Sequence, residues 1–179
     1  MTAERVVCVF GAGRAVEGDK LFEQAVELGF LLASAGYTVA NGGYSGTMRA
    51  SAKGARRANG PVIGVTCSAF GRSGPNEYIT REIQTESLDQ RLRTLVQLGD
   101  AYLVLPGGTG TLLEFADIWE RRNKRFASAL KPIIIVGEFW NDLIALMQKA
   151  DPQSVRHLMV AVDPKDAVAL LQAAWNDNN

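Results

Sequence analysis

The sequence is poor in histidine and cysteine, and these shortages exclude several kinds of site. With one histidine, His157, the chain has few nitrogen ligands for a zinc centre and little basis for a Ser-His-Asp triad. We expect His157 to be a structural residue at the entrance of a strand. The two cysteines, Cys8 and Cys67, lie in apolar segments, which favours buried free thiols over a disulfide. We therefore expect no metal site.

An excess of charge and long apolar runs are also missing. The chain has 19 basic and 19 acidic side chains, and this balance argues against a protein that binds duplex nucleic acid. No apolar run approaches the roughly 18 residues of a membrane-spanning helix, so we expect no membrane partner. The first residues, MTAERVVCVF, lack the layout of a signal peptide and lead directly into an expected strand, which indicates a cytoplasmic protein.

The chain is rich in apolar residues, and these occur in two patterns that alternate along the sequence. Its 179 residues, 47% of them apolar, suit one globular domain over residues 1–179. Short apolar runs alternate with segments of helical spacing, which predicts an α/β fold: a Rossmann-like, doubly wound, mostly parallel sheet with helices on both faces. The expected strands are Val6–Phe10, Thr38–Ala40, Val62–Thr66, Ala101–Leu105, Ile133–Val136 and Leu158–Val162. The expected helices are Asp19–Ser34, Thr47–Ala58, Leu88–Leu98, Thr111–Arg121, Trp140–Lys149 and Pro164–Trp175.

Three turns rich in glycine follow the first, second and fourth expected strands: FGAGR, NGGYSGT and PGGTGT. One such turn can reflect tight geometry alone, but parallel strands bring all three to the edge where open α/β sheets bind ligands. In LVLPGGTGT a strand ends and a helix follows, so backbone N–H groups converge at the positive end of the helix dipole. We expect a site for a nucleotide or sugar phosphate formed by Gly11, Gly13, Gly42, Gly43, Gly46, Thr47, Gly107, Gly108, Thr109, Gly110 and Thr111.

Two side chains and one segment near this edge allow more than one interpretation. Glu114 falls in the first turn of the expected helix, where it either takes part in chemistry or complements the helix dipole. Thr111 either caps that helix or binds phosphate, or does both. The long segment 67–80, CSAFGRSGPNEYIT, is either a lid or a plain surface excursion.

Other phosphate-binding patterns fit less well. A dinucleotide-binding turn needs a third glycine, which GAGRAVEG lacks. It also needs an acidic residue at the end of the second strand, and Asn41 occupies that position. The P-loop pattern G-x-x-x-x-G-K-[ST] does not occur. An enzyme that uses pyridoxal phosphate needs a lysine in or beside the glycine turns, whereas Lys53 falls on the expected second helix.

The motifs together resemble one family. PGGTGTLLE fits the P-G-G-x-G-T-x-x-E signature of the Lonely Guy (LOG) family, phosphoribohydrolases long mislabelled as lysine decarboxylases. NGGYSGTM is similar to the second turn of that family, with Asn41 in place of its first glycine, and VCVFGAG, GPVIGV and KPIIIVGEFWNDLIALM resemble further segments. The resemblance covers nearly the whole chain, although the stretch ERRNKRFASALK is longer than the family pattern.

The resemblance implies an activity and site residues. LOG proteins hydrolyse the N-glycosidic bond of nucleoside 5′-monophosphates, AMP or N6-modified AMP, without a metal or organic cofactor. By this resemblance Glu114 and Arg91 are catalytic, with Arg93 as the nearest alternative arginine. It also implies a homodimer in which the expected helix 88–98 supplies an apolar face. Leu92 and Asp89 stand where the family pattern has Lys and His, which leaves the preference for cytokinin nucleotides open.

The implied chemistry agrees with these residue types. Cleavage of a ribosyl bond passes through an oxocarbenium-like sugar, which a carboxylate can stabilise while it activates water. An arginine can hold phosphate or ribose oxygens with its planar set of donors. Two other interpretations stay open: a non-catalytic sensor that binds a nucleotide or sugar phosphate in the same crevice, and a scaffold that binds no nucleotide.

Overall fold

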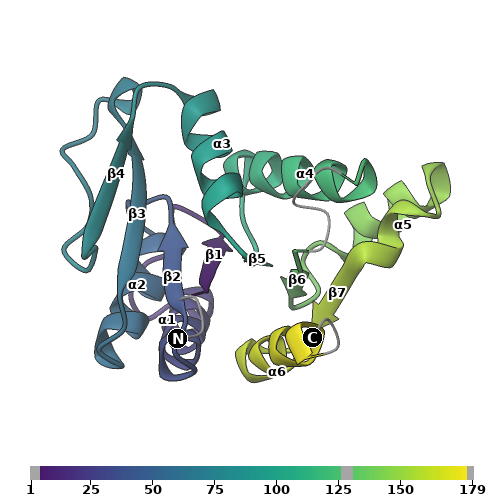
Figure 1. Cartoon of the computed structure of the whole chain (residues 1–179), viewed down its shortest axis with the longest axis horizontal. Coiled ribbons are helices and arrows are strands. Elements are labelled where there is room, and N and C mark those ends of the chain that lie inside the picture. Colours follow the sequence, from purple (N-terminus) through teal and green to yellow (C-terminus); the bar gives the residue numbers. More distant parts are fainter. Residues whose placement is uncertain (1–4, 126–130, 177–179) are drawn as a thin grey trace.

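The computed structural model describes residues 5–125 and 131–176, which form one seven-stranded sheet with the order β4-β3-β2-β1-β5-β6-β7 (Figure 1). Every pairing between neighbouring strands is parallel, as in β1 with β5 and β6 with β7. The predicted α/β fold is therefore confirmed, with a sheet that is fully rather than mostly parallel. The strands are β1 Val6–Phe10, β2 Thr38–Asn41, β3 Val62–Cys67, β4 Arg81–Thr85, β5 Ala101–Val104, β6 Ile133–Val136 and β7 Leu158–Ala161.

Helices cover both faces of this sheet, as predicted. Helices α1, α2 and α6 pack on one face, and α3, α4 and α5 pack on the other (Figure 1). Two short 3₁₀ helices, η1 and η2, precede the edge strands β4 and β7. The bounds are α1 Lys20–Ser34, α2 Thr47–Arg57, η1 Ser68–Phe70, α3 Leu88–Leu98, α4 Thr109–Asn123, α5 Asn141–Ala150, η2 Ser154–His157 and α6 Pro164–Asn176.

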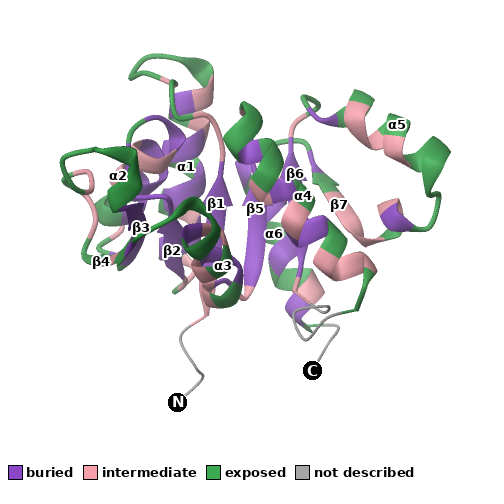
Figure 2. Ribbon diagram, turned by 90° about the horizontal axis from the view of Figure 1, so that it is seen from above, coloured by how far each residue is buried: buried purple, intermediate pink, exposed green. Residues whose placement is uncertain are grey.

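The core lies along the central strands, where Figure 2 shows the buried residues gathered. In β1, Val7 and Val9 belong to the cluster beneath α1, α2 and α6, while Cys8 and Phe10 belong to the cluster beneath α3, α4 and α5. Successive side chains of a strand point to opposite faces, and both faces are covered by helices. This is why the strand reads as a continuous apolar run in the sequence.

Strand β4 was missed by the sequence analysis, which placed no element between residues 67 and 88. Its residues REIQT pair with β3 in register, Ile63 opposite Arg81 and Cys67 opposite Thr85. It is an edge strand, and of its five residues only Thr85 is buried. An edge strand with one neighbour needs no apolar run, so polar side chains hide it from hydrophobic patterning.

The strand order reverses between β1 and β5, and this position locates the expected crevice. The chain winds outward from β1 through β2, β3 and β4 to one edge, and from β5 through β6 and β7 to the other. In such sheets ligands bind beyond the carboxyl ends of the strands on either side of the reversal. FGAGR follows β1 and PGGTGT follows β5, so both turns lie at this position.

The remaining expectations about single residues have clear outcomes. Cys8 and Cys67 are buried free thiols, as predicted, and burial raises the pKa of Cys8. His157 ends η2 immediately before β7, at the expected strand entrance. Within the part of the chain that the structure describes, no helix is long and apolar enough to cross a membrane. Of the long stretch ERRNKRFASALK, residues 126–130 lie outside the described residues.

Candidate functional site

The three glycine turns are joined by hydrogen bonds at the carboxyl edge of the sheet. The Ala12 N–H in the first turn donates to the Pro106 carbonyl in the third at 3.0 Å. The Thr47 N–H in the second turn donates to the Ala12 carbonyl at 2.9 Å. The Ser45 hydroxyl adds a bond to the Gly13 carbonyl at 2.9 Å. The turns thus form one continuous backbone surface, as the sequence predicted from their positions.

Several glycines are required because this surface is so tightly packed. Gly46 has a φ of +69°, and a Cβ there would lie 2.1 Å from the Ala12 carbonyl oxygen. A Cβ on Gly11 would lie 2.6 Å from the hydroxyl of Thr47, which is buried and has no hydrogen-bond partner among the described residues. Gly11, Gly46 and Thr47 therefore lie where the first and second turns contact each other.

Gly108 and Gly110 differ from the other glycines of the site. A Cβ built on either of them would meet no atom within 4 Å. Both residues and Thr109 between them are exposed, at the N-terminus of α4. The N–H groups of a first helical turn have no partner within the helix, and the dipole makes this end positive. This is the part of the site where a phosphate can approach the backbone directly.

Helix α4 begins earlier than the sequence analysis expected, and this changes two assignments. The helix starts at Thr109 with Gly108 as its N-cap, and the N-cap makes no side-chain hydrogen bond. Of the alternatives for Thr111, capping is therefore excluded: Thr111 lies inside the first turn, buried against Gly107. The predicted place of Glu114 was wrong, because it lies in the second turn, where complementing the helix dipole explains less.

Asn41 organises the second turn instead of binding a ribose. Its side chain is fully buried, and its amide NH₂ group donates to the Met48 carbonyl at 2.9 Å and to the Ser51 hydroxyl at 3.1 Å. Its side-chain oxygen accepts from the Gly43 N–H at 2.8 Å. These bonds hold the backbone of Gly43, which has a φ of +79°, against the start of α2. The side-chain amide of Asn41 thus holds the second glycine turn in its conformation.

Arg91 of α3 and Glu114 of α4 meet beneath the glycine turns. Their side chains are 9% and 13% exposed, and Arg91 Nη1 lies 3.5 Å from Glu114 Oε1. This contact is longer than the roughly 2.8 Å of a tight charge-assisted hydrogen bond, so neither group fully satisfies the other. The structure thus brings together the two residues that the sequence predicted as a catalytic pair.

The position of Arg91 is fixed by contacts from three directions. Its Nε donates to the Val65 carbonyl at 2.8 Å, and its Nη2 lies 3.9 Å from the sulfur of Met48. A Cβ on Gly42 would lie 1.6 Å from Nη2, so the guanidinium rests directly on the backbone of the second turn. The competing candidate Arg93 is exposed on the same helix and has no such setting. Burial therefore distinguishes Arg91 from Arg93 and favours Arg91 as the site residue.

Glu114 is poised between its charged and neutral forms. Burial raises the pKa of Glu114 to about 7, and the Arg91 guanidinium opposes this by lowering it. A carboxyl group with this pKa can exchange a proton near neutral pH, which suits a general base or a group that stabilises a cation. Carboxyl groups with pKa shifts of this size are concentrated at functional sites.

Two aromatic residues that the sequence analysis did not single out surround Arg91. The guanidinium carbon lies 5.8 Å from the ring centre of Tyr44 and 5.7 Å from that of Phe70. Tyr44 is held in place because its hydroxyl accepts from the Cys67 N–H at 2.7 Å. Phe70 is 39% exposed and offers a ring face beside the pair. The tyrosine within NGGYSGT was the signal available in the sequence.

The segment 67–80 is attached to the site. The Asn76 backbone N–H donates to the Gly43 carbonyl at 2.7 Å, and its side-chain NH₂ donates to the Tyr44 carbonyl at 2.8 Å. Arg49 of α2 pairs with Glu77 at 2.6 Å. These bonds attach the end of the segment to the second glycine turn and to α2, while residues 68–74 are exposed. This is compatible with the surface excursion considered from the sequence.

The comparisons with known proteins agree with this geometry. The model of the SLOG cluster4 family matches residues 4–168. A probable cytokinin riboside 5′-monophosphate phosphoribohydrolase of Oryza sativa subsp. japonica is 30% identical over 164 residues, covering 88% of this chain and 72% of that protein. The chain belongs to the LOG family. The resemblance drawn from PGGTGTLLE is thereby confirmed.

Two further matches extend over almost the whole of this LOG-family chain. A cytokinin riboside 5′-monophosphate phosphoribohydrolase of Mycobacterium tuberculosis is 29% identical over 186 residues, covering 94% of each protein. The structure of a molybdenum cofactor binding protein from Rippkaea orientalis matches with a TM-score of 0.76 at 24% identity, covering 97% of this chain and 98% of that one. At 24% identity, the match to the molybdenum cofactor binding protein shows that the two proteins share a fold.

The departures of this LOG-family chain from the family pattern lie outside the Arg91–Glu114 contact. Asp89, where the pattern has His, is exposed in the first turn of α3. Leu92, where the pattern has Lys, packs against the core cluster beneath α3, α4 and α5. Among the described residues, no group of three or more His, Cys, Asp or Glu side chains could hold a metal ion.

Proposed function

We propose that this protein hydrolyses the N-glycosidic bond of nucleoside 5′-monophosphates, AMP or N6-modified AMP, to give the free base and ribose 5-phosphate. The observation that carries the proposal is the buried contact between Arg91 and Glu114 beside the open backbone of Gly108 and Gly110. A phosphate site and a carboxyl group with a raised pKa are what this reaction needs. The names of the rice and mycobacterial relatives support the same reaction.

The proposed mechanism begins with the phosphate. Backbone N–H groups at the start of α4, around Gly108 and Gly110, bind the phosphate and so orient the ribose towards Glu114. Arg91 donates its remaining N–H groups to phosphate or ribose oxygens, in a direction fixed by its bond to the Val65 carbonyl. The exposed ring face of Phe70, next to Arg91, is placed to contact the base.

The chemical step uses the carboxyl group of Glu114. As the bond between C1′ and the base breaks, positive charge develops on the sugar, and the carboxylate stabilises it. Glu114 also takes a proton from water as the water oxygen bonds to C1′, and it passes this proton to the nitrogen of the departing base, which restores the carboxylate. No metal or organic cofactor is required in this scheme, because binding and charge stabilisation come from the backbone, Arg91 and Glu114.

We also propose that the protein works as a homodimer. Apolar side chains remain exposed on both helices that carry the catalytic pair: Leu88 on α3 is 44% exposed, and Leu112 and Leu113 on α4 are 36% and 41% exposed. A second copy that covers these side chains would remove apolar surface from water and enclose the site. Sedimentation of the purified protein tests this, and a monomer at all concentrations would contradict it.

The direct test is incubation of the pure protein with a panel of nucleoside 5′-monophosphates. Release of free base and ribose 5-phosphate, followed by chromatography, is expected for at least one purine nucleotide after exhaustive treatment with a chelator. Nucleotide binding without release of any base would favour a non-catalytic binding protein instead. Absence of both would contradict the proposal and favour a scaffold.

Gly110→Val tests the phosphate position within α4. The added side chain meets no protein atom within 4 Å at its first carbon, so the fold is expected to survive, while the approach of an anion to the backbone is obstructed. Binding of AMP should weaken at least about tenfold, since direct hydrogen bonds to a charged group contribute about 1.5–3 kcal/mol. Calorimetric titration with AMP measures this affinity. If the affinity of Gly110→Val equals that of the wild type, the turn has only a structural role and does not bind the phosphate.

A further inference from the structure

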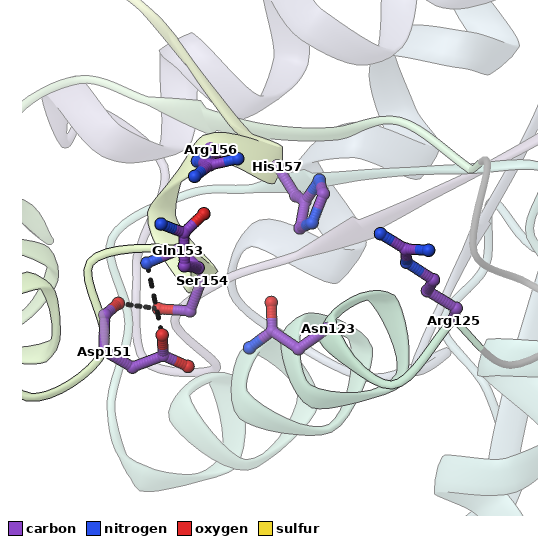
Figure 3. A pocket seen from close by; sticks show the side chains of 7 residues that line it. All are labelled: Asn123, Arg125, Asp151, Gln153, Ser154, Arg156 and His157. Carbon is purple, nitrogen blue, oxygen red and sulfur yellow. Dashed lines mark hydrogen bonds between the residues drawn. The ribbon is translucent and has the colours of Figure 1, made fainter.

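A polar cavity of about 180 Å³ lies at the far end of α4 from the glycine turns (Figure 3). It is bounded by Asn123 and Arg125 at the end of α4. The other lining residues precede β7: Asp151, Gln153, Ser154, Arg156 and His157. Because β7 begins immediately after His157, the cavity lies at the amino edge of the sheet, opposite the carboxyl edge that carries the candidate site. A helix of 15 residues is about 22 Å long, so the two sites are well separated.

The lining of this cavity is positively charged. Arg125 and Arg156 both face it, and neither forms a salt bridge with any residue in the described ranges 5–125 and 131–176. Burial lowers the pKa of His157, and the charges of Arg122, Arg125 and Arg156 lower it further. Asp151 is the one carboxylate of the lining, and it accepts from the Gln153 N–H at 3.2 Å. Positive charge therefore exceeds negative charge here.

Complementing the helix dipole does not account for this arrangement. Arg121 and Arg122 lie in the last turn of α4, where basic residues favourably meet the negative end of the dipole. Arg121 in addition pairs with Asp117 at 2.8 Å. Arg156, however, belongs to η2, a different element, and it faces the same cavity as Arg125. Two elements thus bring cations together against the repulsion between them.

A separate observation comes from Asn123. Its side-chain oxygen is buried and has no hydrogen-bond partner among the described residues. In Figure 3 the Arg125 guanidinium extends towards the His157 ring, whereas the Asn123 amide is turned away from Arg125, towards Ser154. A buried polar group without a partner is unfavourable, and a terminal amide can present either its oxygen or its NH₂ group by a half-turn. The cavity therefore offers polar groups that a bound ligand would satisfy.

We propose that this cavity is a second binding site, for a phosphate group, distinct from the phosphate position of the glycine turns. Arg125 and Arg156 pair with its anionic oxygens. Asn123 and the neutral imidazole of His157, each able to donate or accept, bond to the remaining oxygens, including the hydroxyl of a singly protonated phosphate. The ligand is inorganic phosphate or the phosphate end of a small metabolite. This site does not depend on the proposed hydrolysis.

The single histidine makes the test specific to this cavity. The imidazole proton signals of the full chain come from His157 alone, so NMR titration with inorganic phosphate at constant ionic strength reports on this position. We expect a saturable change in those signals, and a pKa of His157 raised by roughly one unit, because a nearby anion favours the imidazolium form. A parallel titration with ribose 5-phosphate distinguishes the sources: the ligand that saturates at lower concentration is the better fit.

Variants decide whether the change arises in the cavity. Arg125→Gln combined with Arg156→Gln should abolish saturation while the fold survives, since both side chains are exposed to solvent. Lys124→Gln is the matched control, because it removes one charge at the same helix end from an exposed side chain that pairs with Glu120 instead. It should leave the titration unchanged, and so should Gly110→Val, which alters only the glycine turn.

Three results would overturn the proposal. One is a change in the His157 signals that grows without saturation and is reproduced by chloride at the same ionic strength. Another is saturation that persists in the double arginine variant, because binding would then lie elsewhere. Loss of the response in Gly110→Val would also contradict the proposal, since the signal would then be transmitted from the glycine turn.

Discussion

Replacing Glu114 with glutamine is expected to lower the rate of base release by about 10²–10⁴-fold. The substitution keeps the shape of the side chain and its contact with Arg91, but it removes the negative charge that stabilises the developing sugar cation. Binding of AMP should change much less, because the phosphate is held by the backbone around Gly108 and Gly110. The loss should therefore appear in kcat rather than in the dissociation constant.

The matched control for this substitution is Glu120→Gln. It makes the same chemical change on the same helix, at an exposed carboxylate whose pairing with Lys124 at 3.5 Å is typical of a weak surface ion pair. Its turnover should equal that of the wild type. Turnover that survives Glu114→Gln would mean that another carboxylate acts, or that the reaction needs none.

The pH profile supplies an independent check on the role of Glu114. Burial raises the pKa of Glu114 to about 7, so its charged form dominates only above that pH. If the carboxylate is the active form, kcat/KM should rise about tenfold per pH unit below about pH 7 and level off above it. This dependence should be absent from the residual activity of Glu114→Gln. A rate that instead falls as the pH rises through 7 would assign catalysis to the protonated acid.

The sequence predicted the central strands and the apolar edge strand β7, but it missed the polar edge strand β4. Strands with neighbours on both sides and helices on both faces must be apolar, as Ile133–Val136 shows, so their sequences reveal them. Arg81–Thr85 has one neighbour and few buried side chains, and its polar sequence is compatible with a loop. The start of α4 was misplaced because Thr109 and Gly110 were assigned to the glycine turn, whereas they already form the first helical turn.

The candidate site shows the same division between local and non-local information. Glu114 could be found from its motif, because the motif lies within one strand, one turn and one helix. The family pattern favoured Arg91 over Arg93, but the burial that distinguishes them depends on β3 and the second glycine turn packing over α3. Asn41 was recognised only as a replacement, for a carboxylate in one pattern and for a glycine in another, and its bonds to Met48 and Ser51 needed the folded turn.

The second large expected effect comes from Gly42→Ala, a change of one methyl group outside the reacting pair. The backbone of Gly42 does not have a positive φ, so alanine fits its conformation. Its Cβ would, however, lie 1.6 Å from Arg91 Nη2 and 2.6 Å from the Met48 sulfur. Both neighbours are ends of flexible side chains, so the fold should survive while the guanidinium moves away. A displacement of this kind can cost about 10²-fold in turnover.

A double-mutant cycle decides whether Gly42→Ala acts through Arg91. Arg91→Ala alone should lower turnover and weaken AMP binding, because the arginine contacts substrate in the ground state as well. Adding Gly42→Ala to Arg91→Ala should then cause little further loss, since the clashing group is gone and contacting residues are not additive. Arg93→Ala, on the exposed side of the same helix, controls for the loss of one positive charge. If the losses from Gly42→Ala and Arg91→Ala instead multiply, the methyl group acts by reshaping the turn itself, and the contact of the guanidinium with Gly42 is not what positions it for catalysis.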